Sequence, residues 1–328
     1  MKTANLFINP QTKLLRSGWR AFAFLLALTF PQGIVNLFFK STAPSGEAPA
    51  NTVFEVSGTM IFTYGVLVAW VMLISWLCLR FLDRMSLRSL GLALHSNWQR
   101  ELVLGFAMSA TMMTLICGLQ GLAGSTKIGP NSIWINGTPS EIGLLLKDTL
   151  LALLLLILAG AFEELMFRGY AFQTLLRGMS PIVPIVLLSV YFGLGHWGNP
   201  NRTLFSTINT VLAGIWLSVA YLKTRSLWFP TALHFGWNWT MGAFFGLPVS
   251  GLRIPQQSIF ESSISSPVWL TGGAYGPEGG AAASVVILLS IIFVWRTDWL
   301  AIAPEAQSAS TESLPADDTT ILLNLQNE

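Results

Sequence analysis

The chain has 328 residues, of which 52% are apolar and only 10% are charged, with a net charge of +2. A soluble globular protein carries about 25% charged residues. These values argue against a disordered chain, a soluble enzyme, and a nucleic-acid-binding protein, which would need a dense basic surface. The composition instead indicates a protein that keeps most of its surface in lipid.

Apolar runs of roughly 20 residues, long enough to cross about 30 Å of hydrocarbon, predict the fold. We expect an all-α polytopic membrane bundle of about eight transmembrane helices. The predicted spans lie near residues 18–39, 57–82, 102–123, 143–168, 182–198, 204–222, 227–247 and 281–296. The expected divisions are residues 1–100 with two spans and a loop, residues 101–298 with the main bundle, and a disordered polar tail at 299–328.

Lysines and arginines gather on alternate loops and predict the orientation. The loop after the second span carries Arg80, Arg84, Arg88 and Arg100, whereas the opposite loops hold far fewer basic residues. Because basic loops stay on the cytoplasmic side, both termini of this multi-pass protein should be cytoplasmic in a cell membrane. On this orientation, residues 248–280 form the longest outer loop. His95, in a cytoplasmic loop, should be solvated, whereas Cys78 and Cys117 should only fill packing space.

Ionisable residues are costly inside a membrane and therefore point to function. Glu163 and Glu164 follow an uncharged apolar run, and side chains of adjacent residues lie about 100° apart on a helix. Glu164 and Arg168 are four residues apart, so they share a face and can form an ion pair. Glu163 then points elsewhere without a local cation, as expected of a general base. The alternative is an interfacial charge cluster.

Two further polar groups interrupt later spans. His196 ends the run Phe192-Gly-Leu-Gly-His196, and alone it can be an ordinary interfacial residue. His234 and Asn238 are four residues apart and share a face, which also suits a structural hydrogen bond between helices. A helical hairpin turning at residues 178–181 would place Glu163 and His196 at equal depth, because each lies 15 residues from that turn.

A glutamate with two imidazoles can activate water directly or through a metal, and an amide can donate to an oxyanion. Neither a GxSxG nor an HExxH motif occurs in the sequence. The ordered set Glu163-Glu164-x-x-x-Arg168, Phe192-x-x-x-His196 and His234-x-x-x-Asn238 resembles the CPBP family of intramembrane proteases. That family includes type II CAAX prenyl endopeptidases and bacterial proteins linked to bacteriocin processing and immunity. The resemblance covers about residues 140–246.

The resemblance implies a role for each motif residue. Glu163 would activate water with the help of His196, and His234 with Asn238 would stabilise the oxyanion. Glu164 and Arg168 would form a supporting salt bridge. A zinc ion on Glu163, His196 and His234 and a metal-free glutamate mechanism are both compatible with these residues.

The expected partners are membrane lipid and a peptide or protein substrate at the membrane, prenylated or bearing a leader, and not nucleic acid. The sequence leaves the oligomeric state open. One alternative function is a membrane scaffold or bacteriocin-immunity protein without turnover. Another is a proton-coupled transporter, which is disfavoured because no inverted repeat is visible.

Overall fold

The computed structural model describes residues 6–10, 12–39 and 55–311, and its helices fall in all eight predicted ranges. They are listed here in chain order: α1 Ser17–Phe39, α2 Gly58–Cys78, α3 Trp98–Leu122, α4 Ser132–Asn136, α5 Pro139–Glu164, α6 Tyr170–Leu176, α7 Ile182–Gly195, α8 Leu204–Thr224, α9 Trp228–Trp239, α10 Val268–Thr271, α11 Ala281–Arg296 and α12 Pro304–Thr311. Short π- or 3₁₀-helical segments occupy η1 Leu79–Asp83, η2 Leu87–Leu90, η3 Leu165–Gly169, η4 Thr240–Phe244, η5 Gly273–Tyr275 and η6 Pro277–Gly279.

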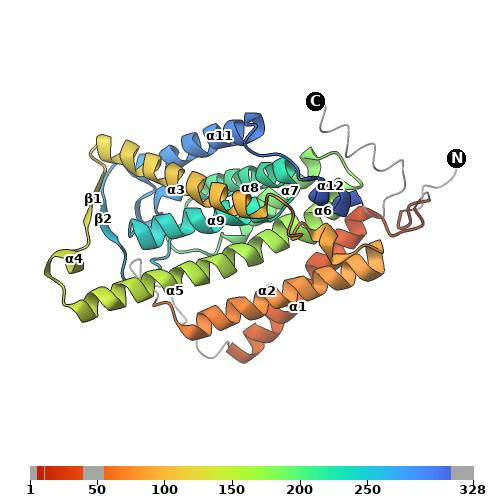
Figure 1. Cartoon of the computed structure of the whole chain (residues 1–328), viewed down its shortest axis with the longest axis horizontal. Helices are drawn as coiled ribbons and strands as arrows, with labels where there is room; N and C mark the ends of the chain where they lie inside the picture. Colours follow the sequence, from red (N-terminus) through yellow and green to blue (C-terminus); the bar gives the residue numbers. More distant parts are fainter. Residues whose placement is uncertain (1–5, 11, 40–54, 312–328) are drawn as a thin grey trace.

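Helix α5 runs through the middle of the bundle, with α1 and α2 on one side and α3, α8, α9 and α11 on the other (Figure 1). Its start is set by Thr138, which caps the first turn together with Glu141, and by Pro139 in the first helical position. The helix continues through η3 into α6, so the helical segment Pro139–Leu176 is 38 residues long. Both glutamates of the first motif lie inside this segment.

Two short strands lie at one end of the bundle, where β1 Thr126–Pro130 pairs antiparallel with β2 Phe260–Ile264. Thr126 faces Ile264, and Pro130 faces Phe260. The fold is therefore mostly helical rather than all-α. Strand β2 belongs to the long loop that follows α9, and β1 belongs to the segment between α3 and α5. The strand pairing therefore connects these two segments by backbone hydrogen bonds.

Four helical segments of the described residues are long and apolar enough to cross a membrane, so the prediction of eight spans is not confirmed. These are Gly58–Asp83, Trp98–Leu122, Pro139–Leu176 and Leu204–Thr224. By contrast, α7 has 14 residues, α9 has 12 and α11 has 16. At about 1.5 Å per residue, each is shorter than roughly 30 Å of hydrocarbon.

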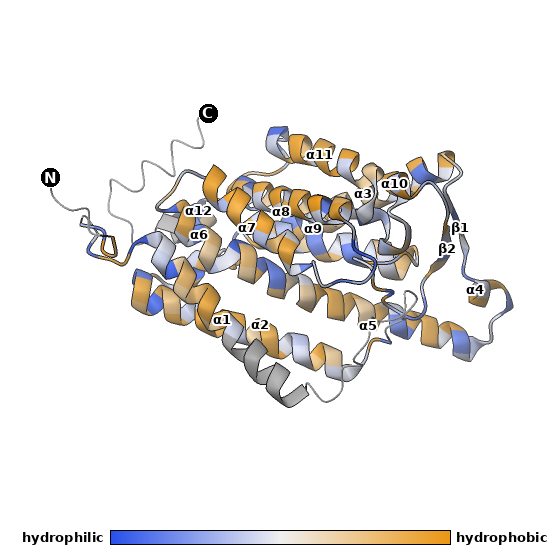
Figure 2. Ribbon diagram, turned by 180° about the vertical axis from the view of Figure 1, so that it is seen from behind, coloured by the Kyte–Doolittle hydropathy of each residue, from blue (hydrophilic) through white to orange (hydrophobic). Residues whose placement is uncertain are grey.

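Most residues along these helices are hydrophobic (Figure 2). Phe62 on α2 is 72% exposed and Leu122 on α3 is 90% exposed. Exposure of such large apolar side chains is unfavourable in water but not in lipid. The buried apolar residues form two large clusters, one among α3, α8, α9 and α11 and the other among α1, α2, α6 and α7. Phe192 belongs to the second cluster and Trp237 to the first, so the two clusters approach each other at the motif helices.

Helices α3 and α9 approach closely at Gly105. A methyl group there would lie 2.8 Å from the carbonyl oxygen of Phe229 and 2.7 Å from Cβ of Ala232. Small residues allow such contacts between membrane helices. We expect Gly105→Ala to push α9 away and lower the thermal unfolding temperature. Gly118→Ala on the same helix is the control, because nothing lies within 4 Å of its added methyl group; equal effects of the two variants would contradict the prediction.

The structure corrects two predictions near the loops and the tail. His95 is buried rather than solvated, with Nε2 3.5 Å from Oε1 of Glu101 on α3. Its burial lowers the pKa of His95, whereas the charge of Glu305 raises it. Helix α12 packs against η2, and Ala303 is buried, because this part of the tail has small apolar residues among the polar ones. Residues 312–328, the rest of the predicted disordered tail, lie outside the described residues.

The predicted packing role of Cys78 and Cys117 is confirmed, since both are buried and free. The start of α1 and helix α12 lie at the same end of the bundle (Figure 1). The cytoplasmic location of the termini stays a prediction, as do the divisions at residues 100 and 298.

Candidate active site

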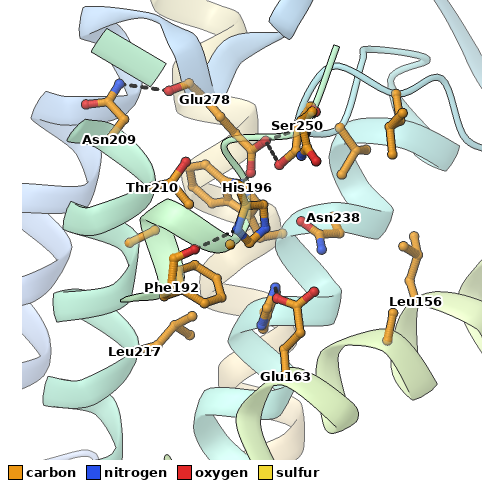
Figure 3. Close-up of a pocket in the computed structure, with 18 of the residues that line it drawn as sticks. Leu156, Glu163, Phe192, His196, Asn209, Thr210, Leu217, Asn238, Ser250 and Glu278 are labelled. Atoms are coloured by element: carbon orange, nitrogen blue, oxygen red, sulfur yellow. Dashed lines mark hydrogen bonds and ion pairs between the residues drawn. The ribbon is translucent and has the colours of Figure 1, made fainter. Parts of the chain in front are cut away.

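A cavity of about 250 Å³ lies at the centre of the bundle, and four of the six predicted site residues line it. These four are Glu163, His196, His234 and Asn238. They come from α5, from the end of α7 and from α9. Glu163 and His196, which are equally spaced from the turn after α6, both line this cavity. Figure 3 shows Glu163 and Asn238 on neighbouring helices facing the same space.

The other two predicted residues, Glu164 and Arg168, are buried behind the cavity. Oε1 of Glu164 accepts a hydrogen bond from Nη1 of Arg168 at 2.9 Å, which confirms the predicted pair four residues apart. Nη2 of Arg168 donates to the backbone carbonyl of Gly214 on α8 at 2.8 Å. The guanidinium also lies 5.0 Å from the ring centroid of Phe192 on α7. Arg168 therefore connects α5 with α7 and α8.

His234 lies between the two adjacent glutamates. Its Nδ1 is 2.8 Å from Oε1 of Glu164, and its Nε2 is 3.7 Å from Oε2 of Glu163. The carboxylate at Nδ1 requires a proton on that nitrogen, so Nε2 can donate only when the ring carries both protons. The buried Glu164 thus orients the imidazole toward the cavity, an arrangement that the sequence did not predict.

The two glutamates have different environments. The side chain of Glu164 is fully buried, whereas 24% of the side-chain surface of Glu163 is exposed to the cavity. Oε2 of Glu163 is buried near Nε2 of His234 and has no hydrogen-bond partner among the residues that the structure describes. A carboxylate that borders a cavity next to an imidazole can accept a proton from a water molecule in that cavity.

The backbone fixes the tautomer of His196. Its Nδ1 lies 2.9 Å from the carbonyl oxygen of Phe192, and only an Nδ1–H can satisfy that acceptor. In the neutral ring, Nε2 is then a hydrogen-bond acceptor. Because His196 lines the cavity, this nitrogen can hold a water proton there.

The helical geometry changes within the first motif and just after the third. A π-helical turn, Leu165–Gly169, follows Glu164, and a second one, Thr240–Phe244, follows α9. Such insertions occur frequently at functional sites because they rotate the side chains that follow. The first turn contains Arg168, so it contributes to the position of the buried guanidinium.

The three expected zinc ligands, Glu163, His196 and His234, all line the cavity. In the part of the chain that the structure describes, no group of three His, Cys, Asp or Glu side chains is arranged to hold a metal ion. Nδ1 of His234 contacts Glu164 and Nδ1 of His196 contacts a backbone carbonyl, so Nε2 is the nitrogen of each ring that remains for a ligand. A zinc ion on these residues therefore stays a prediction.

The cavity has a second polar wall that sequence reasoning missed. It contains Asn199, Asn209, Ser250 and Glu278, of which the last two belong to the predicted outer loop. One signal was present: Glu278 is the only acidic residue between positions 262 and 297, and it directly precedes an apolar span.

Comparison with protein-family models matches residues 145–240 to the family described as type II CAAX prenyl endopeptidase Rce1-like. This segment contains all six predicted site residues and ends before Ser250 and Glu278. No curated protein and no solved structure matches the chain. With four long apolar helices, the family match identifies a membrane protein. The resemblance indicated by the three motifs is confirmed: residues 145–240 are similar to the Rce1-like family of CAAX proteases.

Proposed function

We propose that this protein is an intramembrane endopeptidase that hydrolyses peptide bonds with a water molecule activated by Glu163 and His196. One observation carries the proposal. Four residues of a segment that is similar to a protease family line a single cavity: Glu163, His196, His234 and Asn238. The substrate class that this family's description suggests is a prenylated peptide at the membrane.

The proposed reaction begins with a water molecule between the carboxylate of Glu163 and Nε2 of His196. Glu163 takes a proton as the water oxygen attacks the scissile carbonyl carbon. The side-chain amide of Asn238, and Nε2–H of His234 when its ring carries both protons, donate to the resulting oxyanion. The carbon–nitrogen bond then breaks, and the proton on Glu163 passes to the leaving amine.

This proposal predicts hydrolysis that is resistant to metal chelators, because no step uses a metal ion. The purified protein in liposomes is incubated with a farnesylated CAAX peptide in isotopically labelled water, with and without 1,10-phenanthroline. Mass spectrometry should show one labelled oxygen in the new carboxyl group under both conditions. Loss of cleavage with the chelator, restored by added zinc, would contradict the metal-free mechanism.

An unprenylated copy of the peptide and a leader peptide are tested in parallel to define the substrate. Fragments in membranes of cells with active or Glu163→Ala protein then identify natural substrates. If Glu163→Ala protein still complements a deletion strain, turnover is not the biological role. That result would favour the scaffold or immunity function instead.

A further inference from the structure

The wall of the cavity contributed by the long loop is a tight two-residue β-turn at residues 249–252. The backbone N–H of Val249 donates to the carbonyl of Leu252 at 2.7 Å, and the N–H of Leu252 donates to the carbonyl of Val249 at 2.9 Å. Between them, Ser250 has φ +48° and Gly251 has φ +86°. Positive φ at both central residues defines a type I′ turn.

Ser250 occupies a position that serine rarely takes. Type I′ turns prefer asparagine, aspartate or glycine at the first central residue, because the left-handed conformation strains other L-residues. Gly251 fits because a methyl group there would lie only 2.1 Å from the carbonyl oxygen of Pro200. The turn thus packs on the segment that follows His196, and other contacts must compensate for the strain at Ser250.

Those contacts come mainly from Glu278. Its Oε2 accepts hydrogen bonds from both the backbone N–H and the hydroxyl of Ser250, each at 2.7 Å. The side-chain amide of Asn199 donates to the carbonyl of Ser250 at 3.0 Å. Every polar group of the strained residue is therefore bonded, two of them by one carboxylate.

The same carboxylate also reaches the helix of the third motif. Oε1 of Glu278 accepts a hydrogen bond at 2.9 Å from the indole Nε1 of Trp237, the neighbour of Asn238 on α9. The backbone of Glu278 is held in turn, because the amide of Asn209 on α8 donates to its carbonyl at 2.8 Å. Figure 3 shows Glu278 and Ser250 on the side of the cavity away from Glu163.

We propose that Glu278 is a positioning residue, which holds the turn at residues 249–252 against α9 and thereby completes the substrate-binding side of the cavity. This inference rests on the proposed peptidase function, and it concerns the wall rather than the reacting groups. Val249 and Leu252 of this turn line the cavity. Displacement of the turn would therefore change how a bound peptide lies next to Glu163 and Asn238.

The test begins with Glu278→Gln, which keeps the size of the side chain. An amide has one acceptor oxygen and a donating NH₂ group, so it cannot accept from both Ser250 and Trp237. We expect kcat/KM for the farnesylated peptide to fall about tenfold or more. Hydrogen–deuterium exchange of the purified protein should become faster at the amides of residues 249–252.

The decisive variant is Glu278→Gln combined with Ser250→Gly. Glycine adopts positive φ without strain, so the turn should form again without the carboxylate. We expect slow exchange at the turn to return and kcat/KM to recover to within about threefold of wild type. If Glu278 instead contacted the substrate directly, Ser250→Gly would not restore cleavage by the Glu278→Gln protein.

Glu261→Gln is the matched control. The Glu261 carboxylate also accepts from the backbone N–H and the hydroxyl of one serine, Ser132, but it lies on β2 and does not line the cavity. We expect cleavage by this variant to equal that of wild type.

Three outcomes would overturn the inference. Faster exchange at the turn with unchanged cleavage would show that its position does not matter for turnover, while leaving the peptidase function intact. Loss of cleavage confined to peptides with a positive charge, without rescue by Ser250→Gly, would show that Glu278 binds substrate. A wild-type protein that cleaves none of the peptides would refute the proposed function and this inference with it, whatever the exchange data show.

Discussion

Replacing Glu163 by glutamine should lower kcat for peptide cleavage by about 10²–10⁴-fold, the usual contribution of a general base. Glutamine has nearly the same shape but cannot take a proton from water. Since Glu163 borders the cavity and is not part of the buried Glu164–Arg168 pair, the unfolding temperature should change little. Initial rates with the farnesylated peptide and a thermal unfolding curve in the same detergent measure both effects.

Asp148→Asn is the control for this substitution. Asp148 lies on the same helix, α5, but it does not line the cavity, so its loss should leave kcat unchanged. Full activity of the Glu163→Gln protein on a defined peptide would refute the assignment of Glu163 as the base. Equal losses in both variants would indicate a general effect of removing a carboxylate from α5.

The second large effect should follow from Arg168→Met, which removes one partner of a buried ion pair. Both side chains of the pair are at most 1% exposed. Removing one partner of such a pair costs about 3–5 kcal/mol, because the other charge stays buried without compensation. Arg168→Met also removes the hydrogen bond to Gly214 on α8. We expect the free energy of unfolding, measured by denaturant titration in mixed micelles, to fall by about that amount.

A double-mutant cycle separates the pair from the packing around it. Combining Arg168→Met with Glu164→Gln should cost less than the sum of the two single variants, because no unpaired charge remains. Arg80→Met, at an exposed position, should change stability by no more than about 0.5 kcal/mol. Strict additivity of Arg168→Met and Glu164→Gln would contradict a direct interaction between the two side chains.

The half of the cavity that the motif residues line could be predicted from the sequence because these residues lie on helices. Helical spacing alone places Glu164 with Arg168, and His234 with Asn238, on shared faces. Counting residues on both sides of a turn predicts equal depth for Glu163 and His196, and both line the cavity. The contact between His234 and Glu164 could not be found in this way, since it depends on how α9 rotates against α5.

The second polar wall of the cavity, which contains Ser250 and Glu278, could not be predicted for a different reason. Ser250 and Glu278 are 28 residues apart in a loop, where no helical or strand period relates sequence distance to position in space. The eight predicted spans are also not confirmed, because apolar length was counted across segments where the helix ends. α7, for example, stops at Gly195, before the motif histidine.

The two walls of the cavity belong to different stretches of chain, and this has a consequence for engineering. Moving only residues 145–240 into another bundle would transfer Glu163, His196 and His234 without the turn that faces them. Conversely, exchanging residues 248–280 among homologous proteins would leave these three side chains in place. Chimaeras made at these boundaries would allow selectivity to be redesigned separately from the proposed hydrolytic step.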